Sequence, residues 1–138
     1  MGTDTGASLG TRSERDLATL LASAPREMVF GDDEPAAIVD RYYAPDFEQD
    51  HDGIRFDRER LVQHARPARK NVVSVRAEVH EVLVSGDRFA ARYTLHTVMR
   101  QGATLADELY MFGRLAADGR IRRIDSTTRK VPHGADQP

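Results

Sequence analysis

The chain contains no cysteine. Disulfides, thiolate-bound zinc, iron–sulfur clusters and thiol nucleophiles are therefore excluded. It also lacks any apolar run near the ~20 residues that a membrane-spanning helix needs. The first dozen residues lack the apolar stretch of a secretion signal. We therefore expect a cytoplasmic protein that makes no contact with membranes.

An excess of positive charge is also missing. The 20 basic residues are balanced by 22 acidic ones, for a net charge of −2 at pH 7. A simple polycationic nucleic-acid binder would show a clear basic excess, so we expect no nucleic-acid partner. The neighbours Asp50, His51 and Asp52 cannot chelate together on a regular strand, because adjacent side chains point to opposite faces. We expect neither a metal ion nor a cofactor.

The 138 residues are enough for one domain. Residues 1–12 are small, polar and without periodicity, which predicts a disordered leader. Residues 132–138 are interpreted as a loose tail. The single domain is expected to span residues 13–131.

Three helical segments are expected in the first half of the chain. The first follows Ser13, a capping residue, and its apolar residues recur at helical spacing. Pro25 is expected to kink or divide this helix, and Gly31 to end it. Asp33 is expected to cap a second, short helix, and Asp57 a third.

A strand with alternating character lies between the second and third helices. One set of alternate positions is wholly acidic, comprising Asp46, Glu48, Asp50 and Asp52. The other set is Phe47, Gln49 and His51, which predicts an inner face that ends in a histidine.

The rest of the sequence predicts four strands joined by glycine-containing turns. They cover Val72–Val84, Phe89–Arg100, Thr104–Ala116 and Arg120–Arg129. Helices followed by a strand meander indicate an α+β fold, with the helices on one face of an antiparallel sheet.

The stretches YYAPDFEQDHDG and LAADGRIRRID, with this order of elements, resemble the nuclear transport factor 2-like superfamily. The SnoaL-like polyketide cyclase and ketosteroid isomerase-like branches fit best, and the resemblance covers residues 17–130. It implies a cone-shaped barrel, in which a curved antiparallel sheet wraps around three N-terminal helices and an apolar pocket opens at one end.

The resemblance also implies a catalytic position. In ketosteroid isomerase-like members the general base lies eight residues after the tyrosine of the Tyr-Ala-x-Asp motif, which from Tyr43 is His51. Many SnoaL-like relatives have a histidine one residue earlier, where this chain has Asp50, but the alternation favours His51. A pocket-lining histidine bonded to Tyr42 or Tyr43 is the alternative. Met111 replaces the acidic hydrogen-bond donor of ketosteroid isomerase, so that activity is not expected.

Strand alternation extends the expected site to the other strands. Asp107 is the expected partner acid, with a solvated strand edge as the alternative. The expected ligand-binding residues are Phe47, Gln49, His80, Phe89, Tyr93, Leu109 and Met111, although His80 and Glu78 could instead lie on the outer rim. Pairing across the first hairpin places Val73, Val75, Ala77 and Val79 on the outer face of the sheet, where the stripe predicts a homodimer interface.

Together these observations predict an enzyme without cofactor, in which His51 moves a proton on an apolar carbonyl or polyketide-like metabolite. Isomerisation, cyclisation and dehydration all fit. The alternative is a dimeric, non-catalytic ligand-binding or accessory protein with the same cone fold.

Overall fold

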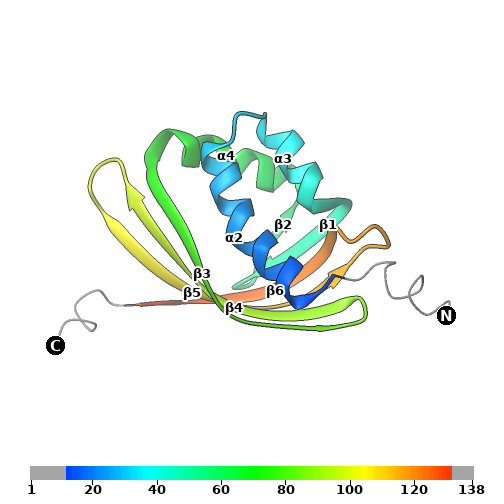
Figure 1. The fold of residues 1–138 in the computed structure, drawn as a ribbon. Coiled ribbons are helices and arrows are strands. Elements are labelled where there is room, and N and C mark those ends of the chain that lie inside the picture. Colours follow the sequence, from blue (N-terminus) through cyan, green and yellow to red (C-terminus); the bar gives the residue numbers. More distant parts are fainter. Residues whose placement is uncertain (1–11, 132–138) are drawn as a thin grey trace.

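The computed structural model describes residues 12–131, which form three helices and a six-stranded sheet. The helices lie together on one face of the curved sheet (Figure 1). The expected α+β cone is therefore confirmed. Most of the expected leader and the tail at 132–138 lie outside the described residues. Arg12, which we assigned to the leader, contacts the domain instead, because its Nε donates to the carbonyl of Gly119 at 2.7 Å.

Helix α2 (Glu14–Phe30) has the predicted ends. The Ser13 side chain accepts a hydrogen bond from the backbone N–H of Asp16 at 3.0 Å, and Gly31 follows the last turn. Pro25 lies inside the helix and does not divide it. None of the helices in residues 12–131 is long and apolar enough to cross a membrane.

The two shorter helices differ in how they begin. Helix α3 (Pro35–Tyr42) starts after Glu34, whose side chain makes no capping bond, with a proline in the first turn. Asp33, expected as the cap, instead forms an ion pair with Arg41 at 2.7 Å. Helix α4 (Arg58–Asn71) starts as predicted, since Asp57 accepts a hydrogen bond from the backbone of Arg60 at 2.9 Å.

The sheet brings the first and last strands together. Its order is β2-β1-β6-β5-β4-β3. The strands are β1 (Tyr43–His51), β2 (Ile54–Asp57), β3 (Val72–Ser85), β4 (Arg88–Met99), β5 (Thr104–Leu115) and β6 (Ile121–Lys130). Neighbours pair antiparallel except β1 and β6, which run parallel with His51 opposite Ser126.

The core lies between the helices and the inner face of the sheet. Its largest fully buried side chains are Phe47, Leu17, Ile38, Ile121 and Val39. Gly113 on β5 leaves room for the Phe89 ring of β4, since a Cβ at this glycine would lie 2.1 Å from that ring. The close packing of β4 on β5 therefore requires glycine here.

A β-bulge at His80 changes which side of β3 faces inward. Val79 pairs with Tyr93 and Glu81 pairs with Arg92, so β3 holds one residue more than β4 between these pairs. Val82 faces inward and packs against the core. From Val75 to Val79, before the bulge, the odd-numbered residues face inward. Our assignment of Glu78 and His80 to the inner face is therefore wrong.

The same bulge corrects the predicted dimer stripe. Three of its four members face inward: Val75 is buried, while Ala77 and Val79 pack against the core. Val73 is exposed. The stripe supplies core packing in place of the interface that we expected.

Candidate active site

The expected inner face of β1 is confirmed. Phe47 is fully buried, Gln49 and His51 are partly buried, and Glu48 and Asp50 are exposed. The His51 side chain keeps 24% of its surface exposed, so it can be reached from outside. His51 therefore combines an inward orientation with access.

A continuous chain of polar side chains surrounds His51. The Gln49 amide donates to the Ser126 hydroxyl at 3.0 Å, and Ser126 Oγ lies 2.7 Å from His51 Nδ1. On the other side of the ring, Nε2 lies 3.1 Å from Thr128 Oγ1. Thr128 Oγ1 donates its own proton to Asp52, so it can only accept from His51, which favours the tautomer protonated at Nε2 and leaves Nδ1 to accept from Ser126.

Asp52 completes this chain. We placed it on the wet face of the strand, but it lies in the turn after β1 with a φ of 52°, and its Oδ2 comes within 3.4 Å of His51 Nε2. Thr127 and Thr128 donate hydrogen bonds to its carboxylate, and these bonds lower its pKa to about 2. Asp52 is thus an anion at neutral pH beside the protonated edge of His51.

Aromatic rings connect His51 to helix α4. The Phe56 ring of β2 lies edge-on to His51 at 6.4 Å and contacts His64 of α4 at 5.2 Å between centroids. Arg60 lies over the same phenyl ring at 5.3 Å. Phe56 therefore stands between the His51 cluster and the helix that covers the cone.

A mostly apolar cavity of about 280 Å³ lies between the helices and the inner sheet face. Its apolar lining includes Met28 and Val29 of α2, Leu61 and Ala65 of α4, Val75 of β3 and Leu95 of β4. Tyr43, His64 and Thr97 are its polar lining residues. His64 is exposed on α4 and also lines this cavity.

The other expected site residues fall into three groups. Phe47, Phe89, Tyr93 and Met111 belong to the buried core, and Leu109 packs against it. Gln49 joins His51 through Ser126. The Asp107 carboxylate binds Lys130 at 3.0 Å, whereas the carboxylate in contact with His51 is that of Asp52. The structure does not bring Asp107 to the histidine.

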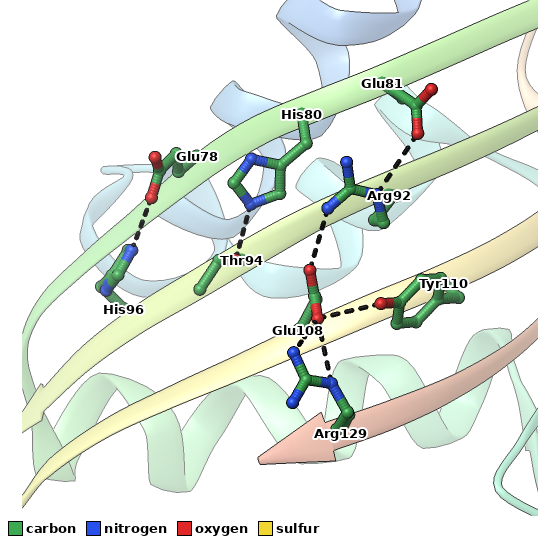
Figure 2. Close-up of polar contacts among 9 residues, drawn as sticks. All are labelled: Glu78, His80, Glu81, Arg92, Thr94, His96, Glu108, Tyr110 and Arg129. Carbon is green, nitrogen blue, oxygen red and sulfur yellow. Dashed lines mark hydrogen bonds and ion pairs between the residues drawn. The ribbon is translucent and has the colours of Figure 1, made fainter. Parts of the chain in front are cut away.

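His80 lies on the outer face, away from this cavity (Figure 2). Its Nε2 is 2.7 Å from the Thr94 hydroxyl, and the neighbouring pair of His96 and Glu78 is 3.0 Å apart. Nearby, Glu108 is almost buried and pairs with Arg92 and Arg129 at 3.0 and 2.7 Å. These bonds and one from Tyr110 lower the pKa of Glu108 to about 2.

Sequence reasoning missed Ser126, Thr128 and the inward turn of Asp52. Ser126 and Thr128 alternate with exposed residues on β6, as inner-face positions should. No sequence pattern near these residues indicates that β6 lies beside β1. Within residues 12–131, no group of three or more His, Asp and Glu side chains could hold a metal ion.

Comparisons with known proteins agree with the fold. A SnoaL-like domain profile matches residues 27–124. No curated protein matches the sequence significantly. Among solved structures, IdmH of Streptomyces antibioticus, a candidate polyketide cyclase, has 18% identity and a TM-score of 0.62, over 85% of this chain and 92% of that one. AclR of Streptomyces galilaeus, a candidate hydroxylase, has 16% identity and a TM-score of 0.64, over 85% and 91%.

A third similar structure is a protein from Catenulispora acidiphila with a ketosteroid isomerase-like fold, solved with trimethylamine. It has 13% identity and a TM-score of 0.62, over 83% of this chain and 85% of that one. At these identities the structural matches establish the fold alone. The profile covers most of the domain, and the chain belongs to the SnoaL-like domain family of the nuclear transport factor 2-like superfamily.

Proposed function

We propose that the protein catalyses acid–base chemistry without a cofactor on a small, apolar carbonyl compound. The supporting observation is the placement of His51, an accessible, inward-facing imidazole with Ser126 at one nitrogen and Asp52 near the other. Isomerisation, cyclisation and dehydration all begin with removal of a proton next to a carbonyl. An imidazole is suited to this step because it titrates near neutral pH.

The two sides of the His51 ring would have different tasks. Asp52 and Thr128 hold the Nε2 edge, and the nearby carboxylate stabilises the positive charge that forms when Nδ1 takes a proton. Because Nδ1 accepts a hydrogen bond from Ser126, this nitrogen carries the free lone pair and is the basic one. A substrate C–H group would displace the Ser126 hydroxyl from it. The proton held at Nδ1 then returns to another carbon or to a leaving hydroxyl.

The test uses 1-indanone as a model ketone in D₂O. Deuterium entry at the carbon beside the carbonyl, followed by NMR, measures proton abstraction without knowledge of the natural substrate. His51→Gln should reduce the protein-catalysed rate by roughly 10²–10⁴, the usual effect of losing a general acid–base group. Circular dichroism checks that the variant is folded.

Asp50→Asn is the matched control, because Asp50 is the adjacent residue and is exposed on the opposite face of β1. It should leave the exchange rate nearly unchanged. Strong loss in Asp50→Asn with an active His51→Gln would contradict the proposal.

A non-catalytic ligand-binding protein is the second candidate. It is favoured by the apolar cavity, whose lining includes His64 but not His51. Ligand binding without deuterium exchange above the buffer rate would support it over the enzyme.

Either protein would act as a homodimer through the outer face of β3–β6. Here Leu83 and Phe112 are 63% and 72% exposed, beside a groove of about 440 Å³. The surrounding acidic and basic side chains are largely paired with each other, so two copies of this face would not repel. A second copy is therefore the occupant that fits this groove.

A further inference from the structure

The inner face of β4 carries a tyrosine whose hydroxyl has no hydrogen bond in the described part of the chain. Tyr93 is only 8% exposed, and no residue in 12–131 donates to or accepts from its hydroxyl. Buried polar groups are normally paired, so an exception requires an explanation.

The Tyr93 hydroxyl must face open space inside the cone. Among the described residues, every fully enclosed side-chain nitrogen or oxygen has a partner. The unpartnered Tyr93 oxygen is therefore not fully enclosed. Its side chain points inward, opposite Val79 and Leu109, and two residues further along β4 Leu95 lines the cavity. Tyr93 is therefore the inward-facing residue of β4 next to the cavity-lining Leu95.

A second free phenol lies close by. Tyr43 lines the same cavity, and its hydroxyl likewise has no hydrogen bond from the described residues. Its ring is fixed edge-on against Phe47, with 4.7 Å between centroids. Burial, and to a smaller extent the nearby Tyr43, raises the pKa of Tyr93, and burial raises the pKa of Tyr43 to about 12. Both groups therefore remain protonated hydrogen-bond donors at any working pH.

We propose that the Tyr93 and Tyr43 hydroxyls together bind one acceptor oxygen of the ligand, a ketone or enol oxygen, inside the apolar cavity. This assignment rests on the proposed function and names the part of its ligand that is recognised. Two donors in an apolar site would also stabilise negative charge on that oxygen when the neighbouring carbon loses a proton. They could thus replace the acidic donor whose position Met111 occupies.

The alternative is that both tyrosines only fill the core. The two possibilities differ in their dependence on the ligand's oxygen. Replacement by phenylalanine keeps the ring and removes only the hydroxyl. If the hydroxyls serve a ligand, Tyr93→Phe and Tyr43→Phe should leave the urea unfolding midpoint unchanged or raised, because no hydrogen bond within the protein is lost.

The test compares 1-indanone with indane, which has the same rings and no oxygen, by NMR titration of the full chain. The wild type should bind the ketone more tightly than the hydrocarbon. Each Tyr→Phe variant should weaken ketone binding about 3- to 10-fold, the range expected for one hydrogen bond, and leave indane binding unchanged. Tyr110→Phe is the control, since its hydroxyl bonds Glu108 on the outer face; it should alter neither affinity.

Equal affinity of the wild type for both compounds, binding of neither, or an unchanged ketone preference in either variant would overturn the proposal. A clear fall in the urea midpoint of Tyr93→Phe would do the same, because it would show that the hydroxyl is bonded within the protein. His51→Gln separates this proposal from the proposed function, since it should strongly reduce deuterium exchange while keeping the preference for the ketone.

Discussion

Removing the bulge residue His80 should cost little, whereas removing Ala77 three residues earlier should be severe. His80 is the extra residue between the pairs Val79–Tyr93 and Glu81–Arg92. Its deletion removes this bulge, and every other side chain of β3 keeps its face. Deletion of Ala77 cannot be compensated by loss of the bulge alone, because some side chains must then change faces.

The contacts that each deletion changes determine its expected effect on the free energy of unfolding. Deletion of His80 removes its 2.7 Å hydrogen bond to Thr94, which contributes about 0.5–1.5 kcal/mol. Deletion of Ala77 leaves two registers. In the first register the residues before Ala77 keep their partners and the bulge closes, so that Glu78 and His80 turn inward and Val79 turns outward. In the second register the residues after Ala77 keep their partners, so that Arg76 turns inward and Val75 turns outward. Each places a charged group in the apolar interior, which costs about 3–5 kcal/mol when no partner is present, a large share of the ~5–15 kcal/mol that stabilises a domain.

Urea unfolding followed by circular dichroism measures both deletions against the wild type. We expect a small shift of the midpoint for the His80 deletion and a protein that is unfolded or severely destabilised for the Ala77 deletion. If the two deletions cost the same, or if loss of Ala77 is the milder change, the bulge does not lie at His80 and the inner and outer faces of β3 have been assigned wrongly.

Two further predictions concern the outer face. Because its ion pairs depress the pKa of Glu108, this carboxylate stabilises the fold above its ordinary pKa of 4.5, and the contribution is lost as the pH falls towards about 2. Glu108→Gln should therefore make urea stability less dependent on pH between 4.5 and 2, and an unchanged dependence would contradict the assignment. For the dimer, Phe112→Glu should yield the 15.4 kDa monomer in sedimentation velocity at micromolar concentration. Ile54→Glu, which alters an exposed residue of β2, should not, and a wild type that is already monomeric would refute the interface.

The inner face of β1 could be predicted because the information is local. Four acids alternate with Phe47, Gln49 and His51 in consecutive residues, and a regular strand has only two faces. The helix ends at Ser13, Gly31 and Asp57 were predictable for the same reason, since capping depends on residues within one turn.

The bulge in β3 also left a trace in the sequence that we did not use. From Val73 to Val79 the apolar residues occupy odd positions, whereas Val82 and Val84 occupy even ones, with Leu83 as the exception. This change of parity shows that one extra residue lies between them. We counted strict alternation back from the hairpin and did not allow for the extra residue. Every residue before the bulge was therefore assigned to the wrong face, including Val75 and Glu78.

The partners of His51 were beyond local reasoning. Ser126 and Thr128 contact the histidine only because β6 lies parallel to β1 in one particular register. Asp52 reaches it only because the backbone enters the left-handed region at the turn. Neither the register nor that turn can be predicted from the residues beside His51.

The parallel pairing of β1 with β6 also bears on how the protein is made. His51 and Ser126 are 75 positions apart, so a ribosome must complete four strands and a helix before they can meet. Contacts between such distant residues form late and slow the folding of small domains. The nascent chain therefore carries its histidine without the groups that orient it, and the chemistry proposed for His51 would become available only after the last strand has docked.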